Sequence, residues 1–297
     1  MNTNSWNILI LFFCLLISGI LFYKKVISPK YKYEGFSQNE KFVLMKDKDI
    51  YDDFYSEIYE HLHVPDKRIN YELKMILDNT QTSTETSVFL DVGSGTGNVM
   101  NELNNMGFQT FGIEQSGSMI EYSKNKYPDV NIIQSTIEDP LAFEAFTFSH
   151  ILCLYYTIYH FRDKKMFFRN CYKWLKPGGY LIIHLVDKEK YNMIIPVNNN
   201  SFFKSNKVQS KQSMVDFVDF KYKISYQFIG DDKTIVTETF TDTLTSNVRQ
   251  NENTFYMEDI EKIVEFAKWC GFIPHGIVNL KKMGDENQYL YFFERSL

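Results

Sequence analysis

Residues 88–100, with the sequence VFLDVGSGTGNVM, contain the residue types best suited to hold a ligand. The apolar run at 88–92 is typical of a parallel strand that is buried on both faces. Gly93, Gly95 and Gly97 follow it and can turn the backbone sharply, with no Cβ between their N–H groups and a ligand. A helix that begins here would add its positive N-terminal end. The pattern predicts a ligand cradle; a turn with a purely structural role is the competing interpretation.

The next predicted strand, residues 110–113, ends in Glu114. Doubly wound α/β folds place a carboxylate about twenty residues after the glycine turn, where it accepts hydrogen bonds from both ribose hydroxyls. An acid that caps the next helix is the alternative. The dinucleotide fingerprint G-x-G-x-x-G does not fit, because Asn98 occupies the position of its third glycine. The glycine spacing therefore disfavours a nicotinamide-dependent oxidoreductase.

Three segments occur in an order and spacing that carry a family resemblance: DVGSGTG at 91–97, GIEQSGSMI at 112–120 and WLKPGGYLII at 174–183. Together they resemble the successive motifs of class I S-adenosylmethionine-dependent methyltransferases. The resemblance extends over residues 86–187. It implies an α/β fold with a doubly wound, seven-stranded, mostly parallel sheet. It also implies that S-adenosyl-L-methionine binds across the carboxyl ends of the first strands.

The resemblance also assigns roles to individual residues. Asp91 would orient the glycine turn and the methionine amino group, and Glu114 would bind the ribose diol. Met119 would flank the adenine together with Gln115, although ordinary core packing is an equal alternative for Met119. The family usually has an acid after the third strand, and here Ser135 or backbone groups would have to replace it. The predicted cofactor contacts are Asp91, Gly93, Ser94, Gly95, Gly97, Glu114, Gln115, Met119, Ser135, Thr136 and Cys153.

Methyl transfer from a sulfonium needs little covalent assistance, since the leaving group is already good and the protein mainly aligns the nucleophile. A base is required only when the acceptor is a protonated amine or a hydroxyl. His160 and Tyr156 follow the strand predicted at 148–154, at the sheet edge where open α/β folds bind ligands. Both are catalytic candidates. His160 could equally be a capping histidine, so the catalytic residues and the methyl acceptor stay unassigned.

Composition limits the kinds of partner. The 297 residues carry a net charge of −5 and have a pI of about 5.7. No basic surface is evident, which disfavours nucleic-acid substrates. The cysteines form no C-x-x-C pair and have no histidine at ligand spacing, so we expect neither a metal site nor a disulfide framework. Unpaired cysteines suit a reducing compartment.

Residues 8–23 are almost wholly apolar, and residues 1–23 carry no charged side chain. A helix of this length spans about 24 Å, against roughly 30 Å for the hydrocarbon core of a bilayer. Trp6 and Tyr23 could extend it into the two interfaces. A cleavable signal peptide is one alternative, but the basic n-region that it requires is absent from this sequence. A buried core helix is the other alternative. We expect a single-pass membrane anchor, with the catalytic domain in the cytosol because lysines follow directly.

The rest of the chain divides by composition into a tether at 28–48 and a methyltransferase domain at 49–297, after the anchor at 1–27. Residues 49–80 predict a helical cap, and residues 188–250 predict a loop followed by an antiparallel insert. Within the insert we expect strands at 220–228 and 234–248. A helix at 256–270 and two closing strands at 272–280 and 288–294 should follow. The two closing strands complete the predicted seven-stranded sheet.

The first predicted cap helix, residues 49–63, carries two neighbouring stripes. One stripe is apolar and should pack against the core of the domain. The other stripe contains Tyr51, Tyr55 and Tyr59. These tyrosines either form the rim of the core or, as in similar methyltransferases, contribute to the cofactor pocket. Two functions remain open. The first is a membrane-anchored methyltransferase that acts on a small molecule, a lipid or a protein. The second is an inactive cofactor-binding protein that is tethered to the membrane and serves in interactions.

Overall fold

The computed structural model describes residues 12–13, 16–18, 38, 40–63, 66–190, 212–216, 220–283 and 286–296. Residues 35–297 form one compact unit, and residues 1–34 form another. Most of the predicted anchor at 1–27, and residues 191–211 of the predicted loop, lie outside the described residues. Within the described part of the chain, no helix combines the length and apolar character needed to cross a membrane.

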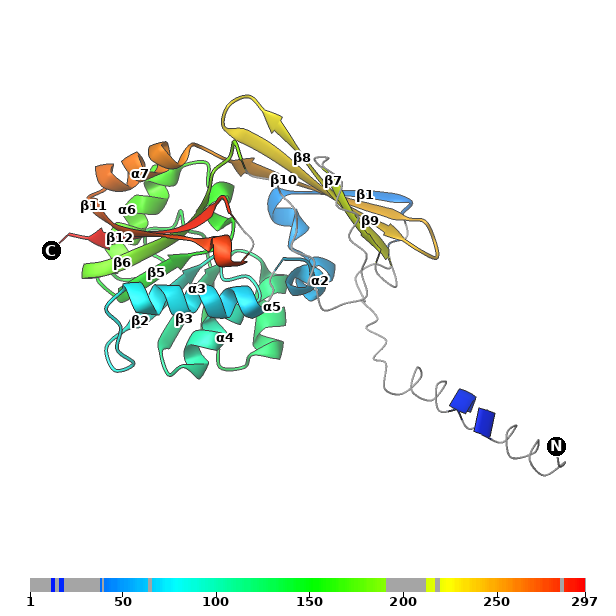
Figure 1. Cartoon of the computed structure of the whole chain (residues 1–297), viewed down its shortest axis with the longest axis horizontal. Coiled ribbons are helices and arrows are strands. Elements are labelled where there is room, and N and C mark those ends of the chain that lie inside the picture. Colours follow the sequence, from blue (N-terminus) through cyan, green and yellow to red (C-terminus); the bar gives the residue numbers. More distant parts are fainter. Residues whose placement is uncertain are drawn as a thin grey trace. The chain divides into compact units, whose positions relative to one another are not determined.

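Seven strands form the main sheet, in the order β11-β12-β6-β5-β2-β3-β4 (Figure 1). Strands β6, β5, β2, β3 and β4 pair in parallel, whereas β12 pairs antiparallel with both β6 and β11. The predicted doubly wound, mostly parallel sheet is therefore confirmed. The strands are β2 (Val88–Val92), β3 (Gln109–Glu114), β4 (Ile132–Gln134), β5 (Phe148–Cys153), β6 (Leu175–Val186), β11 (Phe272–Asn279) and β12 (Gln288–Arg295).

Helices cover both faces of this sheet. Phe292 and Phe293 are consecutive in β12 and so point to opposite faces. Phe292 packs in a buried cluster with Leu73 and Leu103, whereas the ring of Phe293 lies 6.2 Å from that of Phe168. The first face thus carries α3 and α4, and the second carries α6. The helices are α3 (Asp66–Asn79), α4 (Asn98–Asn105), α5 (Gly117–Lys126), α6 (Lys164–Trp174) and α7 (Ile260–Trp269).

A second sheet of five strands has the order β1-β10-β9-β8-β7 (Figure 1). It is antiparallel except that β1 pairs with β10 in parallel. Strand β1 lies inside residues 28–48, so part of the predicted tether is an edge strand. The strands are β1 (Phe42–Lys46), β7 (Gln212–Asp216), β8 (Phe220–Ile229), β9 (Lys233–Asp242) and β10 (Val248–Tyr256).

The prediction of one strand at 234–248 and a helix from 256 was wrong in its boundaries. The chain turns after Asp242, whose Oδ1 accepts hydrogen bonds from the backbone N–H groups of Leu244 and Thr245 at 2.8 and 2.6 Å. This side-chain turn reverses the chain, and β10 then runs back along β9. Strand-favouring Thr and turn-favouring Asn and Asp are mixed along residues 237–254, so the sequence pattern did not locate this reversal.

The helix predicted at 49–63 is divided into the 3-10 helix η3 (Asp47–Ile50) and α2 (Asp53–His63). Asp52 lies at the break and accepts a hydrogen bond from the backbone N–H of Tyr55 at 3.1 Å. The expected apolar stripe is buried, and the ring of Phe54 packs against Phe220 and Phe240 of the second sheet. Helix α2 is therefore held against the five-stranded sheet by aromatic contacts.

Lys164 is buried and joins the start of α6 to the chain after β10. Its Nζ lies 2.5 Å from Glu258 Oε2 and donates hydrogen bonds to the carbonyl oxygens of Tyr256 and Phe161, at 2.7 and 3.0 Å. Burial lowers the pKa of Lys164, and the charge of Glu258 opposes that shift. Removing one partner of such a pair leaves the other charge buried and uncompensated.

The substitution Lys164→Met should therefore lower the free energy of unfolding by about 3 to 5 kcal/mol. Urea denaturation followed by circular dichroism measures this loss. Lys268→Met is the matched control, because Lys268 is exposed on α7 and such substitutions change stability by about 0.5 kcal/mol or less. Equal losses in the two variants would contradict a role for the buried ion pair.

Candidate functional site

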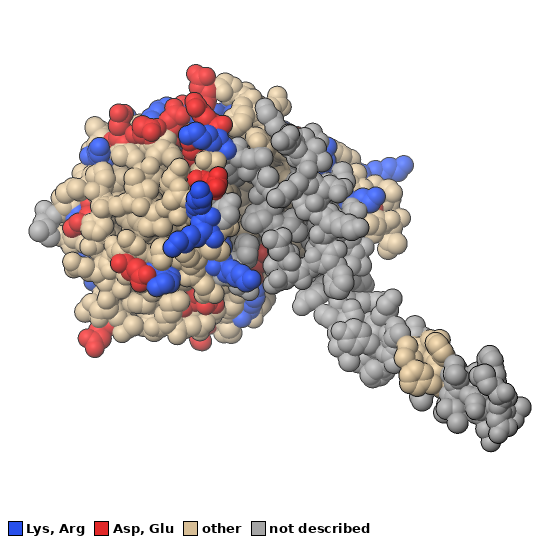
Figure 2. All heavy atoms as spheres, viewed as in Figure 1, with Lys and Arg blue, Asp and Glu red and all other residues tan. Residues whose placement is uncertain are grey.

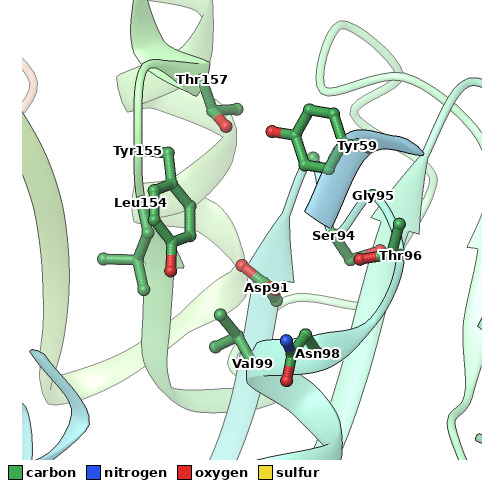
Figure 3. A pocket seen from close by; sticks show the side chains of 11 residues that line it. Tyr59, Asp91, Ser94, Gly95, Thr96, Asn98, Val99, Leu154, Tyr155 and Thr157 are labelled. Carbon is green, nitrogen blue, oxygen red and sulfur yellow. The ribbon is translucent and has the colours of Figure 1, made fainter. Parts of the chain in front are cut away.

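A pocket lies at the carboxyl end of β2, between the glycine turn and the chain that follows β5 (Figure 3). This is the edge of an open α/β sheet at which ligands bind. Three parts of the chain meet there: α2, the turn from β2 into α4, and the segment after β5. The lining residues are Tyr59, Asp91, Gly93, Ser94, Gly95, Thr96, Asn98, Val99, Leu154, Tyr155 and Thr157.

The three glycines of the turn all have left-handed backbones, with φ of 68°, 50° and 76° at Gly93, Gly95 and Gly97. A Cβ at Gly93 would lie 2.6 Å from Thr157 Cγ2, and one at Gly97 would lie 2.2 Å from Ser123 Oγ. At Gly95 the nearest atom would be a backbone oxygen 3.9 Å away. Packing thus requires the outer two glycines, whereas the middle one leaves open space beside the pocket.

Asp91 is the last residue but one of β2 and is only 6% exposed. Among the residues that the structure describes, no donor lies within hydrogen-bond distance of its carboxylate. Burial, followed by the charge of Glu114, raises the pKa of Asp91 to about 8. A buried carboxylate without a donor is unfavourable unless a ligand provides one. Asp91 therefore suits a cationic or hydrogen-bond-donating group in the pocket.

Glu114 ends β3, as predicted, and its carboxylate binds backbone N–H groups. Oε2 accepts from Gly95 at 3.0 Å, and Oε1 accepts from Gln115 and Ser116 at 2.8 and 2.9 Å. Burial raises the pKa of Glu114, and these three hydrogen bonds oppose the shift. Glu114 thus fastens the glycine turn beside the start of α5. The cap of that helix is Ser116, whose Oγ accepts from Met119 N at 3.0 Å.

The structure brings only part of the predicted cofactor set together in this pocket. Asp91, Gly93, Ser94 and Gly95 line it. Glu114 adjoins it through the hydrogen bond to Gly95. The remaining predicted contacts lie outside the lining, and their roles stay predictions; they are Gly97, Gln115, Met119, Ser135, Thr136 and Cys153.

The environments of three of these residues differ. Met119 and Cys153 are fully enclosed in the core, with 1% and 0% exposure, which matches the packing alternative for Met119. Ser135 stands where the family usually has an acid, and its Oγ lies 3.5 Å from Asp139 Oδ2. Asp139 thus places a carboxylate next to Ser135. Its place four residues farther along the chain gave no signal in the sequence.

Several lining residues were not predicted as contacts. Thr96, Asn98 and Val99 are sequence neighbours of the glycines, so proximity alone could have identified them. Tyr59 was one of two alternatives, and the structure places it in the pocket rather than only at the core rim. Tyr155 gave no signal in the sequence, because an aromatic residue after a buried strand is usually part of the core.

His160 and Tyr156, the catalytic candidates, lie beside the pocket rather than in its lining. Tyr51 Oη is 3.3 Å from His160 Nε2 and accepts a hydrogen bond from Asn253 Nδ2 at 3.1 Å. The Tyr51 proton is then directed at Nε2, which requires a neutral ring. Burial lowers the pKa of His160 to about 4, so the ring is neutral at pH 7. Tyr156 stacks 6.2 Å from Phe255 of β10.

In the described residues, no three His, Cys, Asp or Glu side chains are grouped so that they could hold a metal ion. Cys153, Cys171 and Cys270 are free thiols. On the face of the molecule in Figure 2, acidic and basic side chains are interspersed over the described surface.

Comparison with known proteins agrees with this geometry. A family model described as a methyltransferase domain matches residues 90–183. The chain is 29% identical over 136 residues to a ubiquinone biosynthesis O-methyltransferase of Rickettsia conorii, covering 44% of this chain and 46% of that protein. It is 33% identical over 82 residues to an uncharacterized methyltransferase of Alkaliphilus oremlandii, covering 28% and 34%. The chain spans about half the length of the first of these curated relatives.

Solved structures share the fold at low sequence identity. An S-adenosylmethionine-dependent methyltransferase from Clostridium acetobutylicum has a TM-score of 0.61 at 18% identity, covering 82% of this chain and 98% of that one. The CcbJ methyltransferase from Streptomyces caelestis has a TM-score of 0.62 at 13% identity, with 83% and 98% covered. Residues 90–183 thus match a methyltransferase domain, and the chain has the fold of solved S-adenosylmethionine-dependent methyltransferases.

Proposed function

We propose that this protein is a membrane-anchored enzyme that transfers a methyl group from S-adenosylmethionine to an acceptor. The observation that carries the proposal is the pocket beside β2, where the buried Asp91 carboxylate has no donor among the described residues and Gly95 leaves open space. The amino-acid end of the cofactor fits this site, because its ammonium group supplies the missing donor. When bound, S-adenosylmethionine supplies a methyl group that is activated by its sulfonium.

The residues of the protein would then bind the cofactor and orient it. Asp91 holds the ammonium group, and the backbone around Gly95 allows close approach. Glu114, fastened to Gly95 N, is the proposed partner of the ribose diol. Alignment of an acceptor with the reacting carbon supplies most of the rate enhancement in such a site, so no catalytic dyad is required.

The acceptor is a small molecule, a lipid or a protein, and it would approach from the five-stranded sheet. Support comes from the wall formed by Tyr156, His160 and Phe255, which combines aromatic faces with one imidazole. The name of one relative, a ubiquinone biosynthesis O-methyltransferase, favours an apolar hydroxyl compound as the first acceptor to test. For a hydroxyl acceptor, neutral His160 is available as a proton acceptor once it releases Tyr51.

The site is tested by calorimetric titration of the protein with S-adenosylmethionine and with its demethylated product. Both should bind, and Glu114→Ala should weaken both by about 1 to 3 kcal/mol, the cost of losing a buried charged partner. Glu121→Ala is the matched control, because Glu121 is exposed on α5. Absence of binding by the unmodified protein would refute the proposed cofactor site.

The pKa of Asp91 predicts how affinity depends on pH. Burial raises this pKa to about 8, so at pH 6 the ligand-free carboxyl is mostly protonated. A cationic ligand binds the ionised form, so affinity for the demethylated product should rise by up to about tenfold per pH unit from pH 6 to 8, then level off. Calorimetry across this range measures the slope. If the pH dependence of the affinity were unchanged in the Asp91→Asn variant, a group other than Asp91 would be responsible for it.

The proposed anchor predicts where the protein is found in cells. Residues 8–23 are apolar and are followed by four lysines, the order typical of a cytosolic catalytic domain. The full chain should remain in the membrane fraction after washing with alkaline carbonate, whereas a chain that lacks residues 1–27 should be released. Recovery of the full chain in the supernatant would refute the anchor and leave the cofactor site untouched.

A further inference from the structure

The five-stranded sheet exposes large apolar side chains at the end where β1 and β10 begin. Leu244, in the turn between β9 and β10, is 93% exposed, and Phe42 and Leu44 of β1 are 51% and 41% exposed. The turn leads directly into Val248, which pairs with Phe42, so the three residues share one end of the sheet. Single exposed apolar residues are common, but a group of large ones marks a contact surface. We call Phe42, Leu44 and Leu244 the apolar end.

The turn that carries Leu244 is ordered. Asp242 Oδ1 accepts hydrogen bonds from the backbone N–H groups of Leu244 and Thr245 at 2.8 and 2.6 Å, and from Thr245 Oγ1 at 2.9 Å. Asn247 Nδ2 donates to the carbonyl oxygen of Gln38 at 3.1 Å. The exposure of Leu244 is therefore a feature of a fixed turn and does not arise from a fraying chain end.

The opposite end of the same sheet is tied to the rest of the domain. Phe228 and Ile229, which precede the turn between β8 and β9, are 37% and 46% exposed. Asp232 of that turn lies 3.2 Å from Lys188 Nζ, after β6, and 2.8 Å from Lys262 Nζ of α7. The protein's own residues therefore hold that end. The apolar end lies at the other end of these strands, away from these contacts.

The chain reaches the apolar end directly from the proposed membrane anchor. Gln38 Nε2 donates a hydrogen bond to the Val248 carbonyl oxygen at 2.9 Å, which places Gln38 beside the start of β10. Gln38 lies eleven residues after the end of the proposed anchor at residue 27. Even a fully extended chain of this length spans no more than about 40 Å. Covalent connection alone therefore keeps the apolar end near a membrane that the anchor enters.

The charges in this part of the chain suit an anionic lipid surface. Residues 24–41 contain five lysines and two glutamates. At the apolar end, Lys41 and Lys221 are exposed, and the carboxylate of Asp242 is occupied by the N–H groups of its own turn. Proteins bind the interface of anionic membranes by combining exposed apolar side chains with nearby basic residues. A lipid surface is therefore the partner that fits this end of the sheet.

We propose that the apolar end docks on the surface of the membrane, with Phe42, Leu44 and Leu244 in the interfacial region of the bilayer. The inference rests on the proposed function, since the anchor provides the membrane. Phe255 of the proposed acceptor wall lies seven residues beyond Val248 in β10, which is about 23 Å along the strand. Docking would therefore hold the acceptor side of the enzyme close to the lipid surface in a fixed orientation.

Hydrogen exchange followed by mass spectrometry tests the inference on the full chain in lipid vesicles. One set of vesicles contains phosphatidylcholine alone, and the other contains phosphatidylcholine and phosphatidylglycerol in equal amounts. The amides of residues 242–247 should exchange about threefold or more slowly in the anionic vesicles, because the lipid surface excludes water from the turn. The turn at 229–233 is the internal reference, and its exchange should be the same in both sets.

A pair of variants tests the role of the apolar side chain. Leu244→Ser should abolish the difference between the two sets of vesicles and leave the melting temperature unchanged, because Leu244 is exposed. Leu141→Ser, which alters a leucine that is 81% exposed between β4 and β5, should keep the difference and is the matched control. A difference that persists in Leu244→Ser, or equal exchange of the unmodified protein in both sets, would overturn the inference.

Two further outcomes identify other causes. Slow exchange at 242–247 that depends on protein concentration and not on lipid would show that a second copy of the chain covers this end, and would overturn the inference. If alkaline carbonate releases the unmodified chain from the vesicles, the proposed anchor fails and the inference fails with it. Retention of the chain with an unprotected turn would refute the docking surface alone.

Discussion

The hydrogen bond from Gly95 N to Glu114 Oε2 ties the turn after β2 to the end of β3, and the site depends on it. Two parallel strands that lie side by side end at the same edge, so the turn of one meets the acid of the other. The same carboxylate accepts from Ser116 N and so fixes the start of α5. Asp91, three residues before the glycine turn's Ser94, lines the pocket beside this turn.

Elsewhere in the described structure, buried charges are paired. Lys164 contacts Glu258, and Arg68 contacts Glu72. Asp91 in the pocket differs, because the only charge that acts on it within the described residues is that of Glu114, which has the same sign; burial, followed by this charge, raises the pKa of Asp91 to about 8. Leaving such a carboxyl group buried is unfavourable for the ligand-free protein, and a ligand that supplies a donor or a positive charge recovers that free energy as affinity.

The five-stranded sheet supports one side of the site through α2. Glu238 of β9 accepts hydrogen bonds from Tyr55 and Tyr222, each at 2.7 Å, and so joins α2 to this sheet. Helix α2 also carries Tyr59 into the pocket. The sheet therefore positions one side of the cofactor site through α2, and Asn253 of β10 fixes Tyr51 against His160. The contacts of α2 and Tyr51 with this sheet therefore support both the cofactor pocket and the proposed acceptor site.

The sequence alone determined the glycine turn and Glu114 at the end of its strand, because each depends on residues that are close together in the chain. The seven-stranded, mostly parallel sheet was implied by the family resemblance, whereas its strand order depends on pairings between distant segments such as β2 with β5 and β6 with β12. It also indicated the buried stripe of α2. The tertiary structure decided the rest. The turn at Asp242 creates β10 from residues of ambiguous propensity, and β1 forms only because β10 offers it an edge. Tyr155 depends on Arg68 and His184, which are 87 and 29 positions away, and no local pattern encodes such contacts.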